Sequence, residues 1–183
     1  MANAREILSR MKSVQDTRKI TNAMYLISST KLKKSKKLLE ETEPYFYSLQ
    51  DLIRRILRHM PDVEHFYFNP RKEIKEEDRV KGLIVITGDK GLAGAYNHNV
   101  LKMAQEWMEQ SKNHRLYVVG ELGRHYFEAR HIQVEEQFHY TVQNPTMHRA
   151  RLISSTILED YEEGRLDEVW IIYTQMINSA PSP

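Results

Sequence analysis

The spacing of apolar residues along this chain begins with an unusually long helical pattern. Residues 3–43 contain neither proline nor glycine, and their apolar side chains recur at helical intervals. Alternate steps of four and three residues trace a seam that is apolar at its start and polar or small further on: Ile7, Met11, Val14, Arg18, Thr21, Tyr25, Ser28, Leu32, Ser35 and Leu39. This cadence predicts one long helix of the coiled-coil type.

A second apolar stripe, formed by Ile20, Met24 and Ile27, runs beside this seam. Two adjoining stripes of modest hydrophobicity indicate a helix that is contacted on more than one side, and a helix of an ordinary bundle is the plainer alternative. Pro44 is expected to end or bend the helix, although helical spacing resumes after it. We therefore expect a helical segment over residues 1–60.

The remainder of the chain shows a different pattern. Residues 61–80 are charged, contain two prolines and lack periodicity, so we interpret them as a linker. Short apolar runs and helical patterns then alternate. The expected strands are 82–87, 115–120, 132–138 and 168–177, and the expected helices are 92–111, 121–130 and 144–164, the last with Pro145 in its first turn and Gly164 past its end.

Alternation of strands and helices predicts the fold class. It is typical of an α/β domain with a mostly parallel sheet and helices on both faces, here Rossmann-like and placed over residues 81–178. The whole chain is therefore expected to be α/β, with the long N-terminal helix added to this domain.

Charge is distributed unevenly between these parts. Residues 1–60 hold 13 Lys and Arg against 6 Asp and Glu, whereas the remainder holds 14 against 19. A basic first part suits an acidic protein partner, an anionic membrane surface or nucleic acid, and a solvated helix face is an equally good interpretation. Nucleic-acid binders usually interleave aromatic side chains with basic ones, and no aromatic residue lies between Tyr25 and Tyr45.

Several kinds of chemistry are disfavoured by the composition. The chain has no cysteine, which excludes disulfides, thiolate metal ligands and cysteine nucleophiles. No stretch approaches the roughly 20 apolar residues that a membrane helix needs, and the first residues do not form a secretory signal. The eight histidines show no metal-binding spacing. We expect no catalytic residue, no metal and no cofactor.

The segment VITGDKGLAGAYN, residues 85–97, is the strongest candidate for a ligand site. An apolar run stops at Gly88, Gly91 and Gly94, and a helical pattern follows, as at the start of nucleotide-binding domains. This glycine spacing matches neither G-x-G-x-x-G nor G-x-x-x-x-G-K-[ST], and Asp89 places a negative charge where an anion would bind. We interpret the segment as a tight strand-to-helix turn. A small-ligand-binding Rossmann-like module with a basic interaction helix is the alternative for the whole chain.

Three stretches, in this order, resemble the gamma subunit of the F-type rotary ATP synthase. SRMKSVQDTRKITNAMYLISSTKLKKS (9–35) is similar to the N-terminal helix signature of that family, and ITGDKGLAGAYN (86–97) to its strand–loop–helix signature. EEGRLDEVWIIYTQMIN (162–178) resembles the segment with Gly-Arg-Leu-Asp that leads into a later strand of that family. The resemblance covers essentially all 183 residues. Gly88 departs from the family's commoner serine, and Ala93 from its common cysteine.

The resemblance implies a central rotor shaft that couples ion-driven rotation of the c-ring to ATP synthesis or hydrolysis at alpha–beta catalytic sites. The implied contacts with the alpha and beta subunits are Arg10, Thr17, Arg18, Lys19, Ile20, Thr21 and Met24. The implied contacts with the epsilon subunit and the c-ring, which the family makes through its foot, the α/β domain, and the adjoining helix, are Lys31, Lys34, Asp89, Lys90, Gly91, Gly94, Tyr96 and Asn97. The implied coiled-coil seam is Ile7, Met11 and Val14.

The resemblance also carries expectations about extent and location. The family continues with a second, C-terminal coiled-coil helix, which we expect to be absent from this chain. It implies peripheral association with the cytoplasmic face of a bacterial membrane through the complex, and no nucleic-acid partner. The lack of cysteine argues against the redox-regulated plastid branch.

Overall fold

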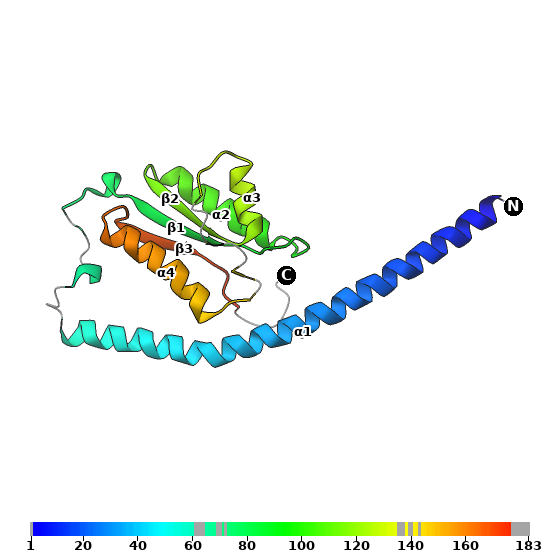
Figure 1. Cartoon of the computed structure of the whole chain (residues 1–183), viewed down its shortest axis with the longest axis horizontal. Coiled ribbons are helices and arrows are strands. Elements are labelled where there is room, and N and C mark those ends of the chain that lie inside the picture. Colours follow the sequence, from blue (N-terminus) through cyan, green and yellow to red (C-terminus); the bar gives the residue numbers. More distant parts are fainter. Residues whose placement is uncertain are drawn as a thin grey trace. The chain divides into compact units, whose positions relative to one another are not determined.

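The computed structural model divides the chain into two compact units, Met1–Phe68 and Asn69–Pro183. It describes residues 2–60, 65–68, 71, 73–134, 138, 141–142 and 144–176. Figure 1 shows that the first unit is dominated by one long helix and that the second is a small sheet covered by helices.

Helix α1 extends from Ala2 to His59 and corresponds to roughly 85 Å at 1.5 Å per residue. It does not end at Pro44, which lies inside it. Proline removes one backbone hydrogen bond, and the bonds before and after it carry the helix across this position. The hydroxyl of Ser48 donates to the carbonyl oxygen of Pro44 at 2.8 Å. Helical spacing after Pro44 was therefore the better guide to the extent of this helix.

Both apolar stripes of α1 are accessible to solvent in this chain. Along the expected seam Ile7, Met11 and Val14 are 52–62% exposed, and in the second stripe Ile20 and Met24 are 62% and 47% exposed. A helix gains little stability from intrinsic propensity alone and normally depends on packing of its apolar face. The stripes are therefore the surface through which α1 can gain stability from a partner.

The second unit is built on a three-stranded parallel sheet in the order β2-β1-β3. The strands are β1 (Lys81–Ile86), β2 (His114–Val119) and β3 (Glu168–Ile172). The register places Leu83 of β1 beside Leu116 of β2 and Trp170 of β3. Strand β1 is central because its continuous apolar run can be buried on both faces.

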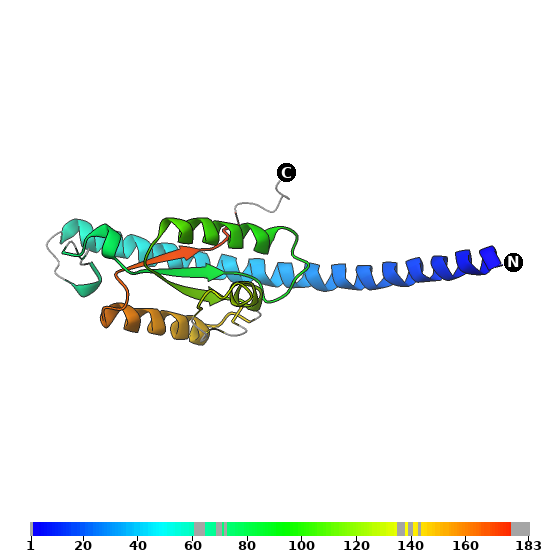
Figure 2. The same ribbon diagram turned by 90° about the horizontal axis from the view of Figure 1, so that it is seen from above.

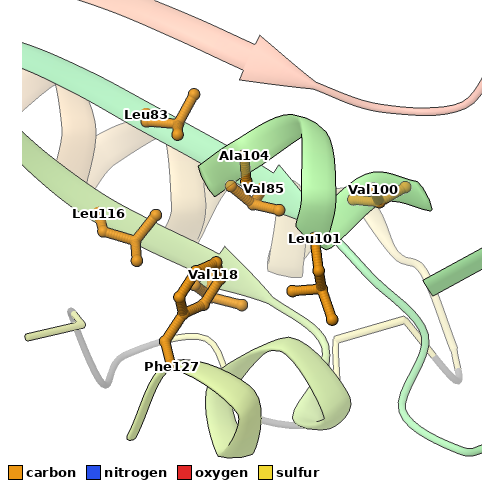
Figure 3. Close-up of a cluster of buried hydrophobic side chains, with 8 residues drawn as sticks. All are labelled: Leu83, Val85, Val100, Leu101, Ala104, Leu116, Val118 and Phe127. Carbon is orange, nitrogen blue, oxygen red and sulfur yellow. The ribbon is translucent and has the colours of Figure 1, made fainter. Parts of the chain in front are cut away.

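Helices cover both faces of this sheet, as expected from the alternating pattern. Helices α2 (Tyr96–Gln110) and α4 (Met147–Glu162) lie on opposite sides, as Figure 2 shows. The shorter helix α3 (Glu121–Glu128) contributes Phe127 to the α2 side. Figure 3 shows the cluster on that side, which comprises Leu83, Val85, Val100, Leu101, Ala104, Leu116, Val118 and Phe127. The α/β fold class with a parallel sheet is confirmed.

The opposite side of the sheet holds a second apolar cluster, in which Ile84, Tyr117 and Val119 pack with Ile157 of α4. Side chains alternate along a strand, so Leu83 and Val85 of β1 serve the first cluster while Ile84 serves the second. One apolar run therefore holds two layers of helices together.

The expected strand over residues 132–138 is wrong for the residues that the structure describes. Residues 132–134 and Phe138 adopt no strand, and residues 135–137 lie outside the described part. Ile132 and Val134 pack against the first apolar cluster, and Phe138 is buried in the second. The apolar alternation here anchors a connection to the core instead of forming a ladder.

Element boundaries also differ from the expected ones. The helix after the glycine-rich segment begins at Tyr96, because residues 92–95 form the preceding loop. Pro145 precedes α4 instead of lying in its first turn, since Thr146 is the N-cap and its hydroxyl accepts the Arg149 N–H at 3.3 Å. Gly164 follows the helix with φ +75°, as its position past the end of the helix predicted.

The boundary between the two units falls inside the expected linker over residues 61–80. This stretch includes two short 3₁₀ helices, η1 (Phe66–Phe68) and η2 (Glu76–Asp78). Buried Arg71 donates to the Leu166 carbonyl at 2.7 Å and to Asp167 Oδ1 at 2.6 Å. These bonds tie the start of the second unit to the entry of β3.

A buried polar cluster joins α4 to β2. The hydroxyl of Tyr117 donates to Asp160 Oδ2, and Arg165 Nε donates to Asp160 Oδ1 at 2.6 Å. Burial raises the pKa of Asp160, but the hydrogen bonds from Tyr117 and Arg165 outweigh that effect and hold the pKa below its ordinary value. The ionised carboxylate therefore stabilises the folded α/β domain.

We expect Asp160→Asn to lower the free energy of unfolding of the α/β domain by about 1–3 kcal/mol at pH 7, because it disrupts a buried charge-assisted hydrogen-bond pair. A carboxyl whose pKa is lowered by folding contributes fully above its unfolded pKa of about 3.9, and the contribution is lost as pH falls through the folded pKa. The wild-type domain should therefore lose more stability on acidification than the variant.

Urea unfolding at neutral and acidic pH, followed by the fluorescence of Trp107 and Trp170, measures this difference. Both tryptophans of the chain lie in the α/β domain. Glu159→Gln removes the adjacent, exposed carboxylate of α4 and is the matched control. Equal acid sensitivity of wild type and Asp160→Asn would contradict the assigned role of this carboxylate.

Candidate functional site

The loop between β1 and α2, residues 87–95, is closed at its base by two hydrogen bonds. The N–H of Gly88 donates to Asn97 Oδ1 at 2.8 Å, and the hydroxyl of Tyr96 donates to the carbonyl oxygen of Ile86 at 3.3 Å. Both bonds join the end of β1 to the first turn of α2. Tyr96 and Asn97, expected as contact residues, thus hold the two ends of the loop together.

Asp89 connects the same loop to α3. Its Oδ1 accepts the N–H of Glu121 at 3.1 Å, and the carbonyl oxygen of Gly88 accepts the N–H of Leu122 at 3.2 Å. The first N–H groups of a helix lack acceptors within the helix, so these two oxygens satisfy the beginning of α3. The Asp89 carboxylate, whose negative charge argued against anion binding, therefore accepts a hydrogen bond from α3.

Close packing at the carboxyl ends of β1 and β2 requires small residues. Thr87 is fully buried, and its Oγ1 accepts the N–H of Gly123 at 3.1 Å. A Cβ on Gly120 would collide with the carbonyl of Thr87, and Gly120 has φ +112°, where only glycine is relaxed. Sequence reasoning did not single out Thr87, Gly120 or Gly123, because their contact joins segments more than thirty residues apart.

These bonds bear on anion binding at the strand ends. A phosphate site needs backbone N–H groups directed at the ligand. At the start of α3, the N–H groups of Glu121 and Gly123 already donate to Asp89 and Thr87. The loop therefore uses its polar groups to fix its own shape, which supports the interpretation as a tight strand-to-helix turn.

The tip of the loop, Gly91 to Ala95, is entirely exposed and carries no polar side chain. Leu92 has φ +63° and Gly94 has φ +57°, so the tip makes a left-handed turn at both positions. The side chain of Lys90, which directly precedes the tip, is also exposed. The loop thus has a bonded base and a protruding apolar tip.

On α1, the expected contact residues form an accessible surface. The hydroxyls of Thr17 and Thr21 donate to the carbonyl oxygens of Ser13 and Thr17, both at 2.9 Å. Lys19 Nζ lies 3.4 Å from Asp16 Oδ1 in a solvent-exposed pair that contributes little stability. The threonine hydroxyls are satisfied within the helix, which leaves their methyl groups and the neighbouring apolar side chains to contact a partner.

The remaining expected residues also lie on exposed parts of this helix. Arg10, Arg18, Lys31 and Lys34 are all exposed on α1, in the first unit. The loop residues belong to the second unit. The candidate contact residues therefore divide between the two units.

Neither a metal centre nor a membrane span emerges from the described part of the chain. Among those residues, no group of three or more histidine or acidic side chains is placed to bind a metal ion. No helix in the same part combines the length and the hydropathy that crossing a bilayer requires.

Comparison with known proteins decides the family. The family profile described as ATP synthase matches residues 3–182 of this chain. The ATP synthase gamma chain of Acetivibrio thermocellus is 45% identical over 179 residues, which cover 98% of this chain and 60% of that protein. The chain belongs to the ATP synthase gamma-chain family. The resemblance drawn from the three sequence stretches is confirmed.

Two further relatives extend the comparison. The ATP synthase gamma chain of Ruminiclostridium cellulolyticum is 47% identical over 178 residues, covering 97% of this chain and 60% of the relative. The "ATP synthase gamma chain, sodium ion specific" of Acetobacterium woodii is 35% identical over 177 residues, covering 97% of this chain and 57% of the relative. The chain thus spans about 60% of the length of these gamma chains.

We expect Asn97→Ala to lower the free energy of unfolding of the α/β domain by about 1–2 kcal/mol, because the N–H of Gly88 loses its acceptor. Asn99→Ala is the matched control, since it changes the same residue type at an exposed position of α2 and should stay within about 0.5 kcal/mol of wild type. Urea unfolding monitored by tryptophan fluorescence measures both. Equal effects of the two substitutions would argue against closure of the loop by Asn97.

We also expect the chain to bind no nucleotide with useful affinity, because the glycine spacing is wrong and the loop's polar groups are directed at the protein. Titration calorimetry with Mg-ATP and with NAD is the measurement. A stoichiometric site tighter than about 10 μM, roughly −7 kcal/mol, would instead support a small-ligand-binding module.

Proposed function

We propose that this chain acts as the central stalk, or rotor, of an ATP synthase. In this role it couples ion-driven rotation of the c-ring to ATP synthesis or hydrolysis at alpha–beta catalytic sites, and it performs no catalysis itself. The observation that carries the proposal is the family match over residues 3–182, because it includes both the long helix and the α/β domain.

Helix α1 has the properties that a shaft surface requires. Its 58 residues form one continuous element, and its described apolar side chains are exposed instead of committed to an internal core. The contacts proposed with the alpha and beta subunits are Arg10, Thr17, Arg18, Lys19, Ile20, Thr21 and Met24. Met24 suits a contact that slides, because its flexible thioether side chain can repack against changing surroundings.

The net positive charge of residues 1–60 supports contact with an acidic surface on the alpha and beta subunits, which form the stator. This segment carries 13 basic and 6 acidic residues, and Arg10, Arg18 and Lys19 lie along its first part. Complementary charge accelerates association and selects partners more than it adds affinity. We place Ile7, Met11 and Val14 in a coiled-coil seam, in which they pack against a second helix.

The α/β domain is assigned to the foot, with contacts to the epsilon subunit and the c-ring. The proposed contact set comprises Lys31 and Lys34 of α1 together with Asp89, Lys90, Gly91, Gly94, Tyr96 and Asn97 of the α/β domain. Within it, Asp89 and Asn97 contribute by shaping the loop, since their side chains accept N–H groups of this domain. Association with the cytoplasmic face of a bacterial membrane is then peripheral and passes through the complex.

Co-purification provides the direct test of this function. An affinity-tagged form of the chain is expected to retain alpha, beta and epsilon subunits of the same synthase when all are produced together. Retention should weaken as salt rises, because screening reduces attraction between exposed charges. A folded chain that retains none of these subunits would overturn the assignment.

Met24→Glu tests the proposed rotor–stator contact. A carboxylate at a sliding apolar contact must be desolvated in each turn, so we expect ATP hydrolysis by the assembled complex to fall about tenfold, equivalent to about 1.4 kcal/mol. Met103→Glu is the control, because it makes the same change at an exposed methionine of α2, outside the proposed contact set. Similar losses in the two variants would contradict a specific role of Met24.

A further inference from the structure

The Gly-Arg-Leu-Asp segment, residues 164–167, has no part in the contacts proposed above. It joins α4 to β3 inside one of the stretches that carry the family resemblance. Gly164 has φ +75°, where the chain turns, and Leu166 is fully buried in the second apolar cluster. The segment is therefore fixed to the core of the α/β domain, and Asp167 stands at its end.

The carboxylate of Asp167 binds both ends of the segment that leads into β1. Its Oδ1 accepts a hydrogen bond from Arg71 Nη1 at 2.6 Å, and its Oδ2 accepts the N–H of Val80 at 2.8 Å. The side chains of Arg71 and Asp167 are only 10% and 6% exposed. Removing one partner of a buried ion pair leaves an uncompensated charge, so the pair resists opening. One carboxylate thus closes the segment from Arg71 to Val80 into a loop.

Arg71 is held by more than this ion pair. Its guanidinium donates to the carbonyl oxygens of Leu166 at 2.7 Å and Tyr161 at 2.5 Å, and it lies 4.3 Å from the centre of the Tyr161 ring. The backbone of Arg71 has φ +45°, in the left-handed region that a residue with a Cβ rarely adopts. Such a conformation persists only where the surrounding structure holds it in place.

Arg79 braces the inside of the same loop. Its Nε and Nη2 donate to the carbonyl oxygens of Ile74 and Arg71, both at 3.2 Å, and its Nη1 donates to Glu168 Oε1 at 2.6 Å. A connection that only spans a distance runs over the surface and tolerates change. The loop is instead bonded internally and to the start of β3, so the α/β domain grips the incoming chain from Arg71 onward.

We propose that Arg71, Asp167 and Val80 form a mechanical clamp, with Asp167 as its positioning residue. The clamp fixes the point at which the chain from α1 enters the α/β domain, so force along the chain reaches the sheet without extending the loop. This inference rests on the proposed rotor function, because a rotor has to transmit torque between its parts. Without the clamp, the ten residues 71–80 could extend by up to about 35 Å under load.

Force spectroscopy on the full 183-residue chain tests the clamp. The chain has no cysteine, so two introduced thiols serve as unique attachment points. His59→Cys at the end of α1 together with Met103→Cys in α2 applies the load through the loop. Met103→Cys together with Met147→Cys in α4 applies the load within the domain and leaves the loop outside the loaded stretch. All three positions are exposed.

Asp167→Ala should add an early extension of about 20–35 Å before the domain unfolds, and only when the load passes through the loop, because both hydrogen bonds of the carboxylate are lost. Arg71→Lys breaks the clamp from the other side, since an ammonium cannot replace the planar guanidinium fork, and should give the same early step. Wild type should show no such step.

Asp160→Asn is the matched control, because it alters another buried carboxylate of the same domain that does not bind the loop. It should lower the unfolding force in both loading directions and add no early step. The clamp would be refuted if neither Asp167→Ala nor Arg71→Lys gave an early step. It would equally be refuted if both only lowered the unfolding force, as Asp160→Asn does.

Coupling in the assembled complex connects the clamp to rotation. Asp167→Ala should lower the number of ions transported per ATP hydrolysed, because slack in the rotor dissipates part of each turn, whereas Asp160→Asn should leave this ratio unchanged. An early extension with an unchanged ratio would overturn the role of the clamp in torque transmission. If the wild-type chain does not assemble with the other subunits, the rotor assignment fails, and the force measurement still decides whether Asp167 clamps the incoming chain.

Discussion

Burial of β1 on both faces is the constraint on which the α/β domain depends. Leu83 and Val85 are fully buried against α2 and α3, while Ile84 packs on the side of α4. A parallel strand with no solvent-facing side requires a layer of helices above and below it, and each layer requires a connection across the end of the sheet. The loop after β1 is one of these connections, so its position follows from the same burial.

At the end of β1, tight packing determines the shape of that loop. Buried Thr87 contacts Gly120 and Gly123 so closely that neither glycine can accept a side chain. Asp89 and Asn97 then use their polar atoms to satisfy backbone N–H groups of α3 and of the loop itself. The apolar tip around Leu92 remains exposed, so the glycine-rich turn uses its base for packing and hydrogen bonding within the domain.

Helix α1 differs from the α/β domain in the interactions that stabilise it. Its backbone bonds are all local, and its apolar stripes remain exposed among the described residues. A helix with such a surface gains stability when its apolar stripes are covered, because intrinsic helix propensity contributes little. The chain thus combines a helix whose described apolar side chains are exposed with a domain that has its own core.

Much of the candidate site was accessible from the sequence, because the motifs are local. The three stretches that carry the family resemblance are continuous in the chain, and the apolar tip lies inside one of them. The sequence did not predict which loop residues bond to the rest of the domain and which remain exposed. Asp89 accepts a hydrogen bond from a residue 32 positions away, and no periodicity or spacing indicates such a partner.

The sequence by itself determined the long helix, the alternation of strands and helices and the family, since helical period, strand burial and motif order depend on neighbouring residues. Tertiary structure alone decided that residues 132–134 anchor a connection instead of forming a strand, and that Arg71 and Asp160 become buried polar links. These outcomes depend on which distant segments share the core. Local pattern records that a side chain is apolar or charged, and only packing determines what it contacts.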